Sequence, residues 1–406
     1  MEARPLNLLD SRRARTAVFT LLYASEGAPI GFIWWALPAL LRAVELPIQQ
    51  ITGLTALVLL PWVFKFAWAP LIDTLRGPRW GFRAWIMTAQ LAMGLTLLPL
   101  IWLDPVAHFD TWRLLLLLHA FSAATQDVAI DALAINSVPI GDRGLLNGCM
   151  QAGMLVGRSL FGGGALLVVA WLGREWMIAA LIGWIWLALL VLLFVREPPE
   201  LAPSPERTAA FRRDLARALR QRRSWLGIGF ALLAGAAFEA TGQLAGPFLV
   251  DRNVDTPTIG LFFGVFAVSA TLLGGLVGGR LSDRWGRLRT VGAFLCGLIG
   301  AIVVLALADL AGSDPGTLIL LLTVMYLFIG LFIASSYALF MDLTDPRLGG
   351  TQFSTYMAAT NGCESWSAWA GGRVAGAAGY PAAFLTMSVV SLTSLALLVL
   401  LARERK

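Results

Sequence analysis

Long apolar stretches of about twenty residues recur along the whole chain, separated by short polar segments. A helix needs about 20 apolar residues to cross the roughly 30 Å hydrocarbon core of a bilayer. These stretches are too long, and alternate too little between polar and apolar positions, to be strands of a membrane barrel. The pattern therefore predicts membrane-spanning helices. We expect twelve of them, at residues 16–41, 49–72, 84–103, 112–137, 146–171, 176–195, 225–250, 258–280, 290–311, 317–341, 351–376 and 382–402.

The composition agrees with a membrane protein, because 58% of the 406 residues are hydrophobic and only 14% are charged. No ordinary soluble domain has that balance. If both termini are cytoplasmic, 24 of the 31 Lys and Arg residues fall in cytoplasmic segments, as the positive-inside rule requires. The net charge of +6 therefore indicates orientation in the membrane and not nucleic-acid binding. The three cysteines have no metal-ligand spacing, so we expect neither a disulfide framework nor a metal or cofactor site.

The longest polar connection, residues 196–224, divides the predicted spans into six and six. We therefore expect an N-terminal six-helix bundle at 1–195, a cytoplasmic linker at 196–224 and a C-terminal six-helix bundle at 225–406. The two halves carry similar segments at corresponding places. "APLIDTLRGPRWGFR" follows the second span and "GRLSDRWGRLR" follows the eighth. Such duplication is typical of transporters that are built from two repeats.

The segment "GRLSDRWGRLR" closely resembles the cytoplasmic motif of the major facilitator superfamily, whereas the copy in the first half is degraded. A narrower resemblance lies in "LPWVFKFAWAPLID" and "TQDVAIDALAINSVPIGDRGLLNG", which look like the branch of anhydromuropeptide permeases and siderophore permeases. The resemblance implies an all-α membrane protein, with twelve transmembrane helices in two pseudo-symmetric six-helix bundles. It also implies a bacterial inner membrane and alternating access. We expect a monomer.

The motif segments are candidates for gating residues. A short turn that carries an acid and several arginines can pair with neighbouring helix ends on the cytoplasmic face. The candidates are Asp73 in the first half, and Asp283, Arg284 and Arg287 in the second. The alternative is that these charges only follow the positive-inside rule.

Acidic residues inside the apolar spans are candidates for proton coupling. Asp127 and Asp131 lie four residues apart, hence on one face of a helix, and Glu26 and Glu239 lie in the first and seventh spans. A buried carboxyl can load and release a proton when its cavity opens to alternate sides of the membrane. The alternative is a structural ion pair, for which Lys65, Arg158 and Arg373 supply candidate bases within the spans.

Several residues within the spans are candidates for binding a substrate. Arg158 can hold an anionic group in two hydrogen bonds, unless it is a permanent partner of the acids. Tryptophans beside polar residues can stack on a flat ligand, whereas Trp184 and Trp186 in an acid-free span are expected to face lipid. The candidate set is Arg158, Trp34, Trp35, Gln126, Gln243, Asn361 and Trp366.

These features predict a secondary active transporter whose partners are a small-molecule substrate, protons and the lipid bilayer. No phosphate-binding loop, zinc-protease helix or nucleophile elbow occurs, so the sequence favours neither an ATP-driven pump nor an enzyme. Proton-coupled import of a siderophore is the main hypothesis. The resemblance to the permease branch implies import, and an aromatic metal chelate suits a pocket lined with tryptophan better than a peptide-sugar does. The alternatives are an anhydromuropeptide permease of cell-wall recycling and an exporter of drugs or metabolites.

Overall fold

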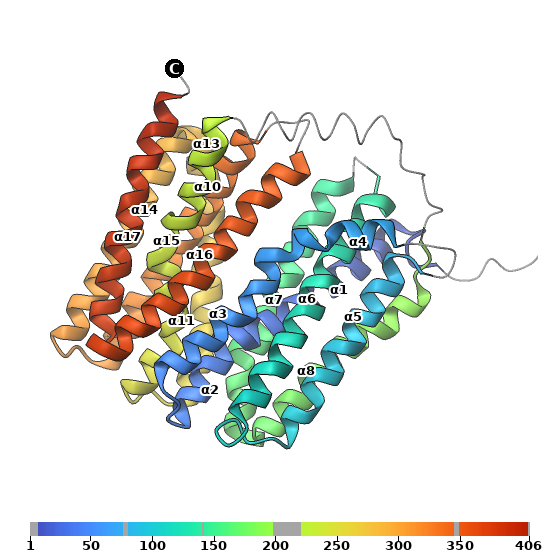
Figure 1. Ribbon diagram of the computed structural model, residues 1–406, viewed down its shortest axis with the longest axis horizontal. Helices are drawn as coiled ribbons and strands as arrows, with labels where there is room; N and C mark the ends of the chain where they lie inside the picture. The colour runs from blue at the N-terminus through green and yellow to red at the C-terminus, as the bar shows by residue number, and fades with distance from the viewer. Residues whose placement is uncertain (1–6, 76–79, 140–141, 198–220, 345–348, 405–406) are drawn as a thin grey trace, which may run out of the picture. The chain divides into compact units, whose positions relative to one another are not determined.

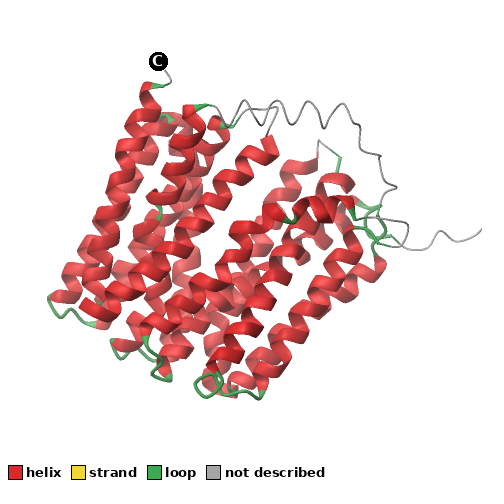
Figure 2. Cartoon of the chain, viewed as in Figure 1, coloured by secondary structure: helices red, strands yellow, loops and turns green. Residues whose placement is uncertain are grey.

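The computed structural model describes residues 7–75, 80–139, 142–197, 221–344 and 349–404. Their regular elements are helices, and no strand occurs among them (Figure 2). The α-helices of the first half, labelled as in Figure 1, are α1 (Arg12–Gly31), α2 (Leu37–Ala43), α3 (Ile48–Phe64), α4 (Ala69–Thr74), α5 (Phe82–Leu97), α6 (Phe109–Ser137), α7 (Arg143–Leu172) and α8 (Arg174–Val191). Those of the second half are α10 (Arg222–Ala234), α11 (Ala236–Asp251), α12 (Thr256–Leu261), α13 (Val268–Trp285), α14 (Arg287–Leu310), α15 (Pro315–Leu343), α16 (Gly349–Ala378) and α17 (Tyr380–Arg403).

Short π- and 3-10 segments join several of these helices into longer stretches. They are η1 (Phe32–Ala36), η2 (Lys65–Ala67), η3 (Leu98–Ile101), η5 (Leu192–Phe194) and η6 (Phe262–Ala267). Among the described residues, eleven continuous stretches are long and apolar enough to cross a bilayer. The 30-residue helix α16 occupies the place of the remaining predicted span, residues 351–376, and is less apolar because it carries several polar side chains. The prediction of twelve long helices is confirmed.

The second predicted span, 49–72, is not one continuous α-helix. α3 ends at Phe64, a 3-10 turn follows at Lys65–Ala67, and α4 begins at Ala69. Pro61 lies inside the last turn of α3, where its ring removes a backbone donor. The backbone therefore changes helix type at Lys65 and carries this lysine on a turn between two helices.

Contacts between residues divide the chain into two compact units, each of which takes a segment from both halves of the sequence. Unit 1 comprises Met1–Val44, Phe64–Glu200 and Asp255–Gly264, and unit 2 comprises Glu45–Val63, Leu201–Val254 and Val265–Lys406. Most of the linker predicted at 196–224 lies outside the described residues. The boundaries predicted at 195 and 225 therefore stay a prediction.

In unit 1, α1 and α7 pack with their backbones in direct contact. A Cβ atom on Gly27 would lie 2.2 Å from the carbonyl oxygen of Met154, and one on Gly157 would lie 2.1 Å from that of Ala24. Only glycine permits this approach, which is common between membrane helices. The close packing fixes the rotation of α1 about its axis and therefore the direction of its polar side chains.

Trp184 and Trp186 on α8 join helices of unit 1 and do not simply face lipid. Both are half-buried. Trp184 Nε1 donates a hydrogen bond of 3.3 Å to the carbonyl oxygen of Ala24, and Trp186 Nε1 donates one of 3.2 Å to that of Gln90. An indole N–H in hydrocarbon needs an acceptor, and each tryptophan finds one on a neighbouring helix. Because both rings stay partly exposed, their contact with lipid stays a prediction.

In unit 2, aromatic side chains fill much of the interior. Phe340 stacks on Tyr356 with ring centroids 5.2 Å apart, and both side chains are fully buried. At one end of the unit, the Arg252 guanidinium donates hydrogen bonds of 2.5 and 2.6 Å to the two carboxylate oxygens of Asp309. Among the described residues, aspartate side chains cap two helices, Asp255 before α12 and Asp314 before α15. Each cap accepts a hydrogen bond from a backbone N–H in the first helical turn.

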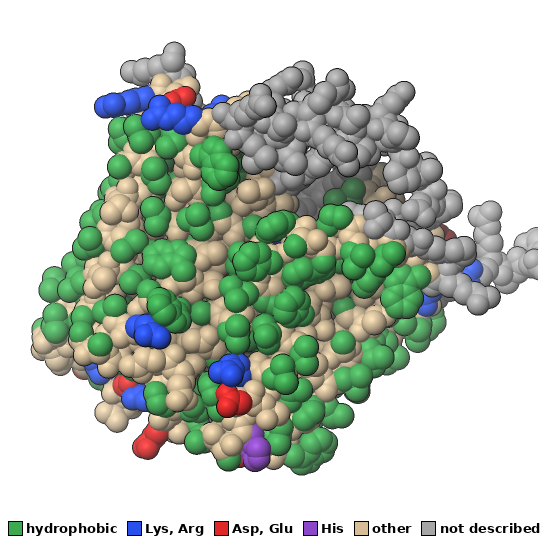
Figure 3. Space-filling view, in the orientation of Figure 1, with side chains coloured by type: hydrophobic (Ala, Val, Ile, Leu, Met, Phe, Trp, Pro, Cys, Tyr) green, Lys and Arg blue, Asp and Glu red, His purple; other side chains and the backbone are tan. Residues whose placement is uncertain are grey.

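Apolar side chains also cover much of the described surface, and charged ones are sparse on the helices (Figure 3). Exposed aromatic and aliphatic residues include Trp171, Leu307 and Val389, each more than half exposed. In water such a surface would favour aggregation, whereas in a bilayer it contacts lipid chains. The surface agrees with the membrane location predicted from the sequence.

Candidate functional site

The acids predicted on the fourth span lie in the interior of unit 1, and Asp127 has a basic partner there. Lys65 Nζ donates a hydrogen bond to Asp127 Oδ2. The Asp127 side chain is 9% exposed and that of Lys65 28%. Of the three candidate bases, Lys65 is therefore the one that pairs with Asp127. Asp127 lies in the middle of α6, and Lys65 reaches it from the 3-10 turn after α3.

Asp131, one turn further along α6, has a different partner. The Tyr23 hydroxyl donates a hydrogen bond to Asp131 Oδ1. Tyr23 lies on α1 and is buried, whereas Asp131 is half-buried. The two neighbouring carboxyl groups of α6 are thus held by chemically different donors, an ammonium and a phenol.

Glu26 lies on α1 one turn after Tyr23 and is 3% exposed. Its carboxyl group lies in the electrostatic field of Asp127, Asp131 and Lys65. Glu26 Oε2 has no hydrogen-bond partner among the described residues.

These residues form a single group, which we call the acid cluster: Tyr23, Glu26, Lys65, Asp127 and Asp131. It holds three carboxyl groups and one ammonium group. If every carboxyl were ionised, the cluster would carry a net charge of −2 in an interior where uncompensated charge costs several kcal/mol. The arrangement is therefore suited to binding and releasing protons.

Arg158 lies on α7 and contacts α1 near the acid cluster, but it forms no ion pair with the cluster. A Cβ atom on Gly31 would lie 2.7 Å from the Arg158 Cα, so the two residues are level, about one turn beyond Glu26 on α1. Arg158 Nε is buried and has no hydrogen-bond partner among the described residues. Among the described residues, no carboxylate forms an ion pair with Arg158. Arg373, the third candidate base, lies over the ring of Trp369, 4.7 Å from its centroid.

The other substrate candidates of unit 1 are Trp34, Trp35 and Gln126. Trp35 stacks on Phe263 at 5.5 Å with an angle of 12° between the rings, and both tryptophans are half-buried. Gln126 is fully buried beside Asp127 in the chain, and neither side-chain amide atom has a hydrogen-bond partner among the described residues. Such a group is able to bind a water molecule or a polar ligand.

The candidates of unit 2 gather on α11 and α16. Gln243 Nε2 donates a hydrogen bond of 3.0 Å to Glu364 Oε1, and Gln243 Oε1 is buried with no partner among the described residues. Glu239 and Asn361 are half-buried on the same two helices. Trp366 Nε1 donates to the carbonyl oxygen of Leu232 on α10 at 2.9 Å, so its indole is fixed against a neighbouring helix.

The gating candidates of the second half form a small ionic group. Arg287 Nη1 lies 2.5 Å from Asp283 Oδ1, and Arg287 Nε lies 3.7 Å from Asp342 Oδ2 at the end of α15. Arg284 is exposed in the last turn of α13. Asp73 belongs to α4, but its side chain lies outside the described residues.

The sequence did not indicate two members of the site. Tyr23 precedes Glu26 by three residues, and this spacing on one helical face was the only signal that could have indicated it. Glu364 lies beside the predicted Asn361 and Trp366, and only the fold pairs it with Gln243. Lys65 was named as a possible base but not as part of the site.

The fold and the acid cluster together define a multi-pass membrane transporter with buried ionisable groups. Residues 19–251 and 231–406 match the sequence model of the Major Facilitator Superfamily. The chain therefore belongs to the Major Facilitator Superfamily, as the motif after the eighth span predicts. Its twelve transmembrane helices correspond to the two pseudo-symmetric six-helix bundles of that fold.

Known relatives resemble the chain over different lengths. The putative transporter AmpG 4 of Rickettsia conorii is 23% identical over 390 residues, which cover 93% of this chain and 94% of the relative. The anhydromuropeptide permease of Escherichia coli K12 is 26% identical over 284 residues, which cover 67% of this chain and 56% of the permease. The match with that permease thus spans little more than half of its length.

Solved structures support the fold. The crystal structure of a D-xylose–proton symporter has a TM-score of 0.76 at 13% identity, with 95% of this chain and 96% of the symporter covered. A bacterial homologue of the human lysosomal transporter Spinster has a TM-score of 0.75 at 16% identity, with 97% of both chains covered. At these identities the likeness concerns the fold alone.

Proposed function

We propose that this chain is a proton-coupled importer of the bacterial cytoplasmic membrane that carries an anhydromuropeptide, with both termini in the cytoplasm. The substrate class rests on the two relatives, one named an AmpG transporter and the other an anhydromuropeptide permease. These names support the alternative raised from the sequence better than they support siderophore import. The orientation rests on the 24 of 31 basic residues that would face the cytoplasm.

Proton coupling rests on the acid cluster, and this is the observation that carries the proposal. Three carboxyl groups share one ammonium group in the interior of unit 1. A proton that arrives on Glu26 or Asp127 lowers the excess negative charge, and it also competes with Lys65 for the Asp127 carboxylate. Protonation therefore loosens a contact between the turn after α3 and helix α6. Alternating access needs such a contact, made in one protonation state and broken in the other.

Substrate contacts are proposed for polar groups that keep unused hydrogen-bonding capacity. The Arg158 guanidinium has a fork of donors suited to a carboxylate, such as the one at the end of a peptide. In unit 2, Gln243 Oε1 is a buried acceptor, with Glu364, Glu239 and Asn361 nearby on the same helices. Arg158 Nε and Gln243 Oε1 would each stay unpaired beside an aromatic chelate, so each favours a ligand that carries carboxylate, amide or hydroxyl groups.

A cytoplasmic latch is proposed for the ionic group at the end of α13. Arg287 contacts Asp283 and Asp342 and so links the start of α14 to the end of α15. A movement of α15 relative to α14 must break or lengthen the contact with Asp342. Asp73 and Arg284 are the corresponding candidates in α4 and α13.

Uptake into proteoliposomes tests the proposed function. The purified chain is reconstituted and supplied with a labelled anhydromuropeptide or a labelled ferric siderophore, each with and without an inward proton gradient. The proposal predicts concentrative uptake of the anhydromuropeptide only when the gradient is present. Uptake of the siderophore alone would contradict the substrate class, and equal uptake without a gradient would contradict the coupling.

A further inference from the structure

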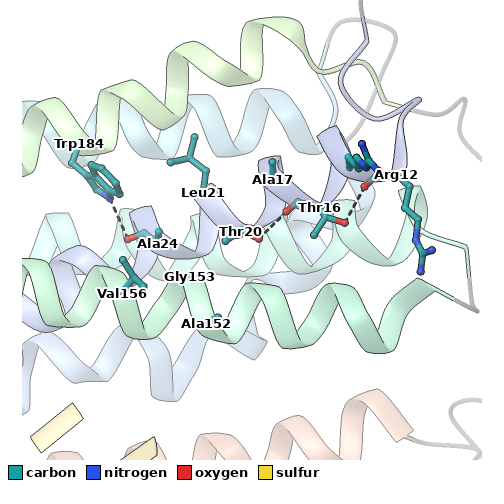
Figure 4. Close-up of a pocket in the computed structure, with 11 residues that line it drawn as sticks. Arg12, Thr16, Ala17, Thr20, Leu21, Ala24, Ala152, Gly153, Val156 and Trp184 are labelled. Atoms are coloured by element: carbon teal, nitrogen blue, oxygen red, sulfur yellow. Dashed lines mark hydrogen bonds between the residues drawn. The ribbon is translucent and has the colours of Figure 1, made fainter. Parts of the chain in front are cut away.

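Unit 1 has a groove between helices α1, α7 and α8 (Figure 4). Its volume is 770 Å³, within the roughly 300–1,000 Å³ of ordinary ligand pockets. One wall is α1, from Arg12 to Ala24, and the opposite wall is α7 at Ala152, Gly153 and Val156. Trp184 of α8 closes the end beside Ala24, to whose carbonyl oxygen it donates its hydrogen bond.

The groove faces away from the proposed proton site. Ala24 lines the groove, and Glu26 follows it by two residues, which is about 160° around the helix. α1 therefore directs Glu26 nearly opposite to Ala24, while Tyr23 lies between these two directions. A ligand in the groove is separate from a substrate that would reach Glu26 or Asp127.

The interior of the groove is apolar, although two threonines line it. The Thr16 hydroxyl donates to the carbonyl oxygen of Arg12 at 2.9 Å, and the Thr20 hydroxyl donates to that of Thr16 at 2.8 Å. The Trp184 indole N–H is likewise hydrogen-bonded, to the carbonyl oxygen of Ala24. The walls thus offer methyl and methylene groups, and the small side chains of Ala17 and Ala152 leave room between them. A polar solute would lose hydration there without gaining hydrogen bonds.

One end of the groove is basic. Arg12 and Arg13 lie there, and both are exposed. Arg12 shares Asp142 with Arg15, at 3.1 and 3.0 Å, whereas Arg13 forms no ion pair with any residue that the structure describes. From Arg13 to Ala24 the helix rises about 16 Å, roughly half of a 30 Å hydrocarbon core. The groove therefore has the length of one bilayer leaflet, with its positive charge at the end where headgroups lie.

We propose that this groove binds one acyl chain of an anionic membrane phospholipid, whose phosphate contacts Arg12 and Arg13. The occupant is a lipid because the chain spans a bilayer, the walls are apolar and the charge at the mouth is complementary to a phosphate. The ligand reaches α1 from the membrane side and packs between α1, α7 and α8.

Native mass spectrometry of the full-length protein in detergent tests this assignment. The protein is titrated with palmitoyl-oleoyl-phosphatidylglycerol and, separately, with the zwitterionic palmitoyl-oleoyl-phosphatidylcholine. We expect tighter retention of phosphatidylglycerol. Replacing both arginines (Arg12→Gln with Arg13→Gln) should weaken it by about five-fold for each arginine removed. The matched control removes two exposed arginines of unit 2 (Arg280→Gln with Arg403→Gln) and should leave its retention unchanged.

A second double variant tests the contribution of the apolar groove independently of the two arginines. Ala17→Leu with Ala152→Leu fills the groove and keeps both arginines, and both positions are exposed, so no core packing is disturbed. We expect at least a five-fold loss of phosphatidylglycerol retention. The control Ala293→Leu with Ala396→Leu, at exposed positions of α14 and α17, should have no effect. Equal retention of the two lipids, or wild-type retention by either the arginine pair or the groove-filling pair, would overturn the proposal.

Discussion

The Lys65 ammonium donates a hydrogen bond to the Asp127 carboxylate, and so joins the turn after α3 to the middle of α6. Removing one partner of a buried ion pair leaves an uncompensated charge and costs about 3–5 kcal/mol. We therefore expect Lys65→Met to destabilise the protein by about 3 kcal/mol, since Lys65 is partly exposed. The double variant Lys65→Met with Asp127→Asn should recover most of that loss, because the Asp127 carboxylate is then no longer left without its cation. Thermal unfolding in detergent measures both, and identical melting of all three proteins would contradict the pair.

The Tyr23 hydroxyl and Asp131 should act as one unit in transport. Tyr23→Phe keeps the buried ring but removes the donor, and Asp131→Asn removes the charge that accepts it. Because each single change breaks the same hydrogen bond, the double variant should lose little more uptake than the stronger single variant. Uptake rates of the four proteins form a double-mutant cycle. Strictly additive losses would show that the two side chains act independently.

Close packing of α1 on α7 should be essential at Gly27. A Cβ atom there would lie 2.2 Å from the Met154 carbonyl oxygen, so Gly27→Ala must push the helices apart beside Glu26. We expect a loss of about 1–3 kcal/mol in stability and a marked loss of uptake. Gly183→Ala on α8 is the matched control, because nothing lies within 4 Å of its added methyl group. Equal stability and uptake of the Gly27→Ala and Gly183→Ala variants would contradict the need for close packing at Gly27.

The helix caps Asp255 and Asp314 should make stability depend on pH. The Thr258 hydroxyl, and then its backbone N–H, lower the pKa of the Asp255 carboxyl, and Thr317 lowers the pKa of Asp314 in the same way. A folded-state pKa below the unfolded value, about 3.9 for Asp, gives stability that is present at neutral pH. This stability is lost as the pH falls through the folded pKa. Replacing both aspartates by asparagine keeps a capping side chain but removes the titration.

The melting temperature in detergent, followed from pH 7 into the acid range, checks this pH dependence. The wild-type curve should fall more steeply than that of the double asparagine variant, so that the two curves converge at low pH. Parallel curves would mean that the caps do not contribute to the pH dependence.

The sequence predicts the fold well because the evidence for each helix lies in one continuous stretch of the chain. Apolar stretches of membrane length identify the helices, and the segment at 279–289 identifies the superfamily. The break at Lys65 was not visible, because residues 49–72 read as one apolar span. A proline near the end of a span can either continue or terminate a helix, and the surrounding packing decides between them.

The candidate site was predictable only in part. Asp127, Asp131 and Glu26 could be identified because charge is costly inside an apolar span. Their partners could not, since Lys65 is 62 residues from Asp127 and Tyr23 is 108 residues from Asp131. From the sequence, Arg158 was as good a candidate for the partner of Asp127 as Lys65 was. Only the packing of α1 on α7 shows that Arg158 lies level with Gly31. Pairing between helices is a property of the tertiary structure, which no local pattern encodes.

If the acid cluster carries the coupled proton, Asp127→Asn should separate substrate transport from proton movement. The purified protein is placed in proteoliposomes with a pH-sensitive dye inside, and an anhydromuropeptide is added outside without an imposed gradient. The wild-type protein and the control Asp110→Asn, an exposed acid on the same helix, should acidify the interior as substrate enters. Asp127→Asn should still exchange labelled for unlabelled substrate but should acidify the interior at least ten-fold more slowly. Acidification by Asp127→Asn at the wild-type rate would contradict the account.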